Sequence, residues 1–119
     1  WTYGISFHCG SDTTYILLRY NQIPSIPNGT LTGLSALTHL LLYDNAITAI
    51  PNKVLSGLMS LKYLWLSNNR ITVIGDGALN GLTTLISLYI DNNDITAIPN
   101  GLFDNLASLE KLYMYHNII

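Results

Sequence analysis

The sequence predicts an α/β solenoid, a right-handed coil with a parallel β-sheet on its concave face and a mostly irregular convex side. The first observation is an asparagine that recurs every 24 residues, at Asn21, Asn45, Asn69, Asn93 and Asn117. The second is an apolar frame around each asparagine, which in the third copy comprises Leu61, Leu64, Leu66, Ile71, Ile74, Leu79 and Leu82. A fixed period of this length indicates stacked supersecondary units that share one continuous core.

Each repeat is expected to contain one short strand just before its asparagine, because the Leu-x-Leu stretch there has a period of two. In the third repeat Leu64 and Leu66 would point inward, while Tyr63, Trp65 and Ser67 would point outward. After the asparagine the chain turns away, and two frame isoleucines fill the interior on the way round. The parallel sheet then follows from stacking one such strand per repeat.

The rest of each repeat is expected to lack regular pairing. Proline follows the last isoleucine at Pro27, Pro51 and Pro99, where it prevents further sheet pairing, and Gly75 takes that place in the third repeat. The return side carries a Gly-Leu step, as at Gly57. We expect that side to be irregular or to hold a single short helical turn.

The chain divides into two parts. Residues 1–12 are off the frame, and the alternation of Ile5, Phe7 and Cys9 with polar neighbours predicts a lead-in strand or partial cap. Residues 13–119 form the repeat domain, with four full repeats and a truncated fifth, so we expect a piece of something longer. Cys9 is either a small buried thiol or half of an N-terminal cap disulfide whose partner lies upstream.

Composition argues against several classes of function. Only 10% of the residues are charged and the net charge is −2, which does not fit a nucleic-acid partner or an anionic membrane surface. No apolar run approaches the roughly 18 residues of a membrane span, so direct membrane insertion is not expected. His39, Asp44 and Ser67 have no nucleophile elbow or oxyanion loop beside them, so we predict no enzyme. The three histidines are too scattered for zinc, and we expect no metal and no cofactor.

The repeated asparagine has a structural explanation. Each sharp turn after a strand leaves backbone groups without ladder partners, and an amide side chain can both donate to and accept from them. Stacked at one position, the five asparagines would form a ladder. We therefore assign Asn21, Asn45, Asn69, Asn93 and Asn117 to the scaffold rather than to a ligand site.

The outward strand positions form four columns that vary in size and charge. They are Tyr15, His39, Tyr63, Ser87, Lys111; Leu17, Leu41, Trp65, Tyr89, Tyr113; Arg19, Tyr43, Ser67, Asp91, Tyr115; and Tyr20, Asp44, Asn68, Asn92, His116. Seven of the eight tyrosines fall there. Aromatic residues suit strands in general, but that explanation alone would also place Val, Ile and Thr in these columns, and none occurs. Exposed aromatics supply stiff contact area at low entropy cost, so we predict a ligand-binding face at Tyr43, Tyr63, Trp65, Tyr89, Asp91, Tyr113 and Tyr115.

From about Thr13 to Ile119 the chain resembles the leucine-rich repeat family in its 24-residue form. Details such as the run from Ile95 to Leu106 are similar to the extracellular repeats of variable lymphocyte receptors and of Toll-like or Slit-like ectodomains. The resemblance implies a non-enzymatic, extracellular or cell-surface module that binds a protein or glycan ligand. Asn28 begins an Asn-Gly-Thr acceptor sequence, which is a possible N-glycosylation site in a secreted protein.

The alternative is a structural protein. Solenoids normally need polar caps for solubility, and bare repeats that stack end to end without closing would form a filament or a surface layer. End-to-end self-association therefore remains open from the sequence.

Overall fold

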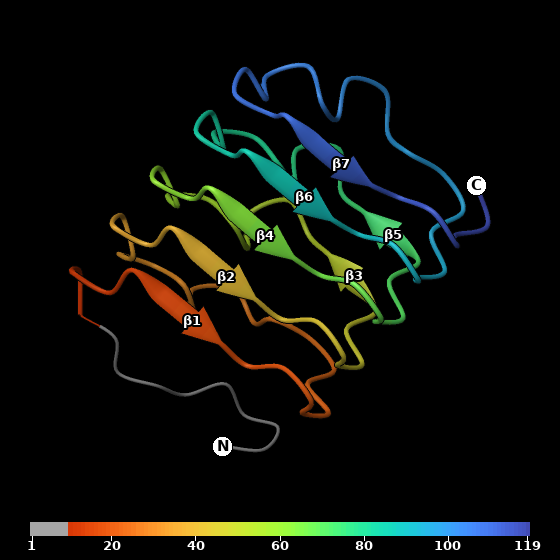
Figure 1. Cartoon of the computed structure of the whole chain (residues 1–119), viewed down its shortest axis with the longest axis horizontal. Coiled ribbons are helices and arrows are strands. Elements are labelled where there is room, and N and C mark those ends of the chain that lie inside the picture. The colour runs from red at the N-terminus through yellow and green to blue at the C-terminus, as the bar shows by residue number, and fades with distance from the viewer. Residues whose placement is uncertain (1–9) are drawn as a thin grey trace.

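The computed structural model describes residues 10–119 and contains a five-stranded parallel sheet with one strand per repeat (Figure 1). The strands, in sheet order, are β1 (Tyr15–Leu17), β2 (His39–Leu41), β4 (Tyr63–Trp65), β6 (Ser87–Tyr89) and β7 (Lys111–Tyr113). This parallel-sheet solenoid confirms the predicted fold class. Of the predicted lead-in segment, residues 1–12, only residues 10–12 are described. The strand expected at Ile5 to Cys9 therefore lies outside the described residues.

The register of the sheet is set by the repeat length. Every residue of a strand pairs with the residue 24 positions later, as Leu40 does with Leu64 and Leu64 with Leu88. Equivalent side chains of neighbouring repeats therefore lie side by side. The inward leucines of the strands and the frame isoleucines form one core, in which Leu40, Leu64 and Ile71 have no exposed surface.

The frame asparagines tie successive repeats together. Nδ2 of Asn69 lies 3.1 Å from the carbonyl oxygen of Leu42 in the preceding repeat, and 3.0 Å and 3.3 Å from those of Leu66 and Ser67. Its Oδ1 accepts a 3.0 Å hydrogen bond from the backbone N–H of Ile47. Asn45, Asn93 and Asn117 make equivalent bonds to the repeat before them. The amides thus pair backbone groups that the strands leave unsatisfied.

A second, two-stranded sheet forms behind the first, between β3 (Ala49–Ile50) and β5 (Val73–Ile74). It was not predicted, and Gly75 accounts for it. The N–H of Gly75 donates a 2.9 Å hydrogen bond to the carbonyl oxygen of Ile50. Pro51 and Pro99 occupy the equivalent place in the flanking repeats and have no N–H to give. Within residues 10–119 this pairing therefore occurs only where glycine replaces proline.

The return segments are runs of turns, with no helix in the described part of the chain. The convex side is therefore irregular, and the short helical turn that the sequence left open does not form. Gly33, Gly57 and Gly81 have φ of 82°, 85° and 84°, and a Cβ there would meet no neighbour. The backbone conformation, rather than space, requires glycine at these turns.

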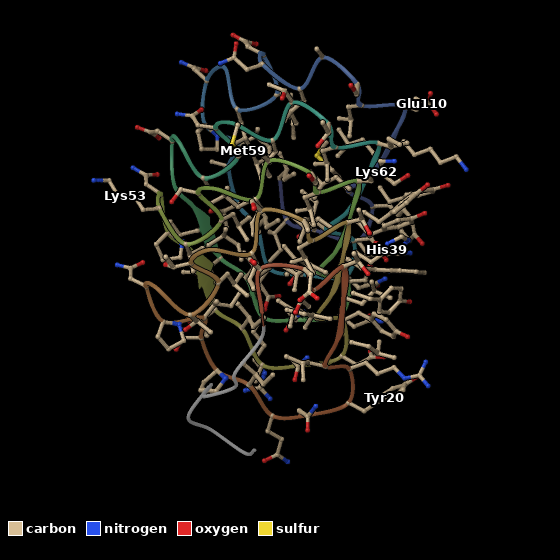
Figure 2. All side chains as sticks on the ribbon, turned by 90° about the vertical axis from the view of Figure 1, so that its left-hand side faces the viewer. Tyr20, His39, Lys53, Met59, Lys62 and Glu110 are labelled. Carbon is tan, nitrogen blue, oxygen red and sulfur yellow. The ribbon has the colours of Figure 1, made fainter. Side chains whose placement is uncertain are left out.

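The two sides of the coil carry different side chains. Figure 2 shows His39, Lys62 and Glu110 on the side of the five-stranded sheet, and Lys53 on the opposite, return side. We call the surface formed by the outward side chains of β1, β2, β4, β6 and β7 the sheet face. No helix long and apolar enough to cross a bilayer occurs in the part of the chain that the structure describes.

Candidate functional site on the sheet face

A continuous stack of aromatic rings runs across the sheet face. The ring centroids of Trp65 and Tyr89 are 4.5 Å apart, and those of Tyr89 and Tyr113 are 4.7 Å apart with an interplanar angle of 5°. Tyr43 extends the stack with a tilted ring, whose centroid lies 5.1 Å from that of Trp65 with an interplanar angle of 41°. Neighbouring strands lie about 4.8 Å apart, so rings at one register position come to stacking distance without bending the chain. None of these rings belongs to the apolar core.

A second, separate stack comprises Tyr15, His39 and Tyr63. Their ring centroids are 4.8 Å and 4.5 Å apart. Tyr63 points to the same face as Trp65 but belongs to this second stack. It is the one predicted binding residue that does not line the hollow described next.

The other six predicted residues surround an open hollow of about 410 Å³. Its lining consists of Tyr43, Asp44, Trp65, Ser67, Asn68, Tyr89, Asp91, Asn92, Tyr113 and Tyr115. The hollow exists because one outward column changes side-chain size. Ser67 and Asp91 are short, while the flanking repeats place Tyr43 and Tyr115 at the same position. Ser67 and Asp91 therefore form the floor of the hollow, and the rings of Tyr43 and Tyr115 rise above it at the two ends of the column.

The floor of the hollow is a hydrogen-bonded network. The Ser67 hydroxyl donates to Oδ1 of Asp91 at 2.6 Å, and Nδ2 of Asn92 donates to Oδ2 of Asp91 at 2.9 Å. Ser67 and Asp91 are only 5% and 6% exposed. Two neutral donors thus hold the Asp91 carboxylate in place.

Outward strand positions are not uniformly exposed, which corrects the simplest form of the sequence prediction. Leu41, Ser67, Ser87 and Asp91 are all buried although they point away from the core. Leu41 is 6% exposed and yet is no part of the core cluster. Alternation along a strand decides which side a residue faces, whereas the size of its cross-strand neighbours decides how much of it stays in contact with water.

Asn68 and Asn92 are additions to the predicted set. Both have left-handed backbone conformations, with φ of 56° and 55°, as does Asp44 at 59°. Asn and Asp tolerate this conformation better than most side chains, which is the sequence signal that places them at the bend after each strand. The bend brings their polar side chains to the edge of the hollow.

A basic side chain, Arg19, contacts the β1 end of this region. Nη1 of Arg19 donates a 2.9 Å hydrogen bond to the Tyr43 hydroxyl, and its guanidinium carbon lies 5.3 Å from the centroid of the Tyr20 ring. The hydrogen bond with Tyr43 raises the pKa of Arg19 above its ordinary value. Arg19 therefore remains charged and is engaged with its own aromatic neighbours.

Comparison with known proteins assigns the chain to a family. A model of the leucine rich repeat matches the chain twice, over residues 12–71 and 60–119. The chain belongs to the leucine-rich repeat family. Leucine-rich repeats are typically non-enzymatic binding modules. A search of curated proteins finds no match.

Among solved structures, the leucine-rich repeat chain is similar to the Toll ectodomain in the Toll–Spatzle complex, described as a molecular hub in Drosophila development and innate immunity. The TM-score is 0.83 and the sequence identity 28%. The match covers 87% of this chain but only 15% of that one. In all, 132 chains of solved structures match, so the fold does not by itself single out a ligand.

The remaining predicted positions lie away from the sheet face. Asn28 is exposed and begins a turn, in which the N–H of Thr30 donates to the carbonyl oxygen of Pro27 at 3.2 Å. Its side chain is accessible to a modifying enzyme, and glycosylation there stays a prediction. Within residues 10–119 no group of three or more acidic, His or Cys side chains is placed to hold a metal ion.

Proposed function

We propose that this leucine-rich repeat domain is an extracellular module that binds a protein partner through its sheet face. The observation that carries the proposal is the ring stack of Tyr43, Trp65, Tyr89 and Tyr113, which lies outside the core and beside an open hollow. These rings are not part of the inward frame that forms the core of the coil. Aromatic side chains held rigid by their neighbours are favoured at interface hot spots.

The similarity to the Toll ectodomain supports two parts of the proposal. That structure is a complex between two proteins, and the matched region belongs to an extracellular domain. The present chain corresponds to 15% of its length, so the likeness supports a class of partner and a location, and leaves the partner's identity to experiment.

The ring geometry favours a protein over a glycan. A sugar binds an aromatic residue by lying on a free ring face. Trp65 is stacked on Tyr89 and contacts the tilted ring of Tyr43, and Tyr89 lies between Trp65 and Tyr113. The two central rings therefore present edges and polar groups to a ligand, which suits the irregular surface of a protein better than a sugar plane.

The test is a paired substitution in the central stack. Partners are selected by wild-type protein from a display library of extracellular proteins, and the same protein is applied to a glycan array. Replacing Trp65 and Tyr89 by alanine together should abolish binding to the selected protein and leave the domain folded, which a dispersed amide NMR spectrum would show. The matched control is Met59→Ala with Val73→Ala, which removes two side chains that are 68% and 59% exposed outside the sheet face.

Binding that survives the Trp65 and Tyr89 pair would place the site elsewhere. A strong glycan signal with no protein partner would overturn the choice of ligand class and leave the sheet face as the site. Equal losses from the control pair would show that the effect comes from stability rather than contact.

A further inference from the structure

The hollow on the sheet face is acidic. Asp44 and Asp91 are among its lining residues, and no lysine, arginine or histidine occurs among the described residues that line it. These are two of the seven acidic residues of the chain. Arg19, at the β1 end, is already engaged with Tyr43 and Tyr20.

Among residues 10–119, Asp91 forms no salt bridge in spite of its burial. Its side chain is 6% exposed, and its two oxygens accept hydrogen bonds from a serine hydroxyl and an asparagine amide. Removing a carboxylate from water without a counter-charge is costly, and two neutral donors offset only part of that cost. A carboxylate has about four lone-pair sites, so Asp91 can accept further donors from a group in the hollow.

The aromatic rings beside the hollow strengthen the attraction between the Asp91 carboxylate and a cation. The rings of Trp65, Tyr89 and Tyr113 pack against each other, so they exclude water from one side of the hollow. An ion pair formed there is less screened than one on open surface. The asparagines on the opposite edge add amide oxygens, which also accept hydrogen bonds from a cation.

We propose that this hollow receives a basic side chain, lysine or arginine, from the partner protein, and that Asp91 and Asp44 are the anions that recognise it. The choice of a protein side chain as the ligand rests on the proposed function. The preference for a cation rests on the charge and burial of the hollow alone. An anionic or neutral side chain would leave the buried carboxylate without a counter-charge and is disfavoured.

The probes are N-acetyl-arginine amide and N-acetyl-lysine amide, with N-acetyl-glutamine amide as the neutral control. Each is titrated into ¹⁵N-labelled protein at low salt, and the side-chain signals of Trp65 and Asn92 are followed by NMR. We expect saturable shifts with the two basic probes, with a Kd in about the millimolar range, and none with glutamine. Shifts that do not saturate, or that the glutamine probe reproduces, would overturn the proposal.

Variants then separate charge from shape. Asp91→Asn keeps the size of the side chain and should weaken binding of the basic probes at least about fivefold. Asp44→Asn should weaken it in the same direction, and it provides a second reading if Asp91→Asn perturbs the fold. Asp104→Asn removes the same charge from the exposed return side and should leave binding unchanged. Equal effects of all three substitutions would contradict a local site.

The two proposals can fail separately. Suppose that binding of the selected protein partner requires Trp65 and Tyr89 but is unchanged by both Asp91→Asn and Asp44→Asn. The sheet face then binds protein, and the proposal that the hollow receives a basic side chain is wrong. If the basic probes bind saturably while the partner tolerates the ring substitutions, the cation site stands and the proposed protein interface is wrong.

Discussion

The Ser67 hydroxyl donates a 2.6 Å hydrogen bond to Asp91, the residue 24 positions later in the adjacent repeat. Both side chains are buried on the outer surface of the sheet rather than in the core. The bond therefore joins two repeats on the face proposed to bind a ligand, and it fixes the carboxylate that forms the floor of the hollow. Stability and recognition are connected through this pair.

Replacing Ser67 by alanine should lower the free energy of unfolding by about 1–3 kcal/mol, because a buried carboxylate loses a donor. Urea denaturation measures the change. The matched control is Ser56→Ala, since the Ser56 hydroxyl donates a 2.9 Å hydrogen bond to the backbone carbonyl oxygen of Lys53 on the exposed return side. That substitution should cost less than about 0.5 kcal/mol. Equal losses of unfolding free energy for the two substitutions would show that the Ser67–Asp91 hydrogen bond does not stabilise the protein more than an exposed one.

Asn69→Ala should also destabilise the protein by about 1–3 kcal/mol, because it leaves buried backbone groups of two repeats unpaired. Asn69 is 7% exposed and bonds across repeats. Asn21 is half-buried, and among the described residues its side chain bonds only to carbonyl oxygens of its own repeat. Asn21→Ala should therefore cost less. A larger cost at Asn21 in the same denaturation experiment would contradict this account.

Tyr20→Asn should raise the free energy of unfolding by about 0.5 kcal/mol. Tyr20 has φ of 58° and is 70% exposed, so it holds a left-handed conformation that disfavours a bulky side chain and gains little burial in return. Asparagine occupies the equivalent bend at Asn68 and Asn92. Thermal denaturation provides the measurement. Tyr15→Asn, in β1 just before the bend, serves as the control and should give no gain. A loss of stability on Tyr20→Asn would mean that the contacts of its ring outweigh the backbone strain.

Gly75→Ala should destabilise by about 1–3 kcal/mol, because a Cβ there would overlap the side-chain oxygen of Asn52. That oxygen already accepts a 3.0 Å hydrogen bond from the N–H of Gly77. In an Asn52→Ala background the same substitution should cost less, since the principal obstacle is gone. A double-mutant cycle measures the difference. Strictly additive effects would rule out this overlap as the cause.

The sequence was sufficient for the scaffold because the scaffold is periodic. A 24-residue spacing determines which residues pair, and alternation within each strand determines which leucines enter the core. The stacking of Trp65 on Tyr89 follows from the same spacing. These properties follow from the repeat length and from the residue types at equivalent positions of neighbouring repeats.

The hollow and the second sheet were not predictable in this way. The depth at Asp91 depends on the contrast between a short side chain and the tyrosines at the same position in flanking repeats, so it is a property of the column rather than of any one repeat. The β3–β5 pair depends on a single Gly75 where proline is the rule. Departures from the repeat, rather than the repeat itself, produced both features.

Cross-strand register has a consequence for how this surface can change over generations. Because each strand meets its neighbour 24 positions away, gain or loss of one whole unit restores every backbone partnership and every inward leucine, yet it places a new set of rings and charges beside the old ones. A duplication or deletion of that length would alter what the domain recognises while the coil keeps its pitch. An insertion of one residue inside a strand would instead turn the following side chains of that strand to the opposite side of the sheet.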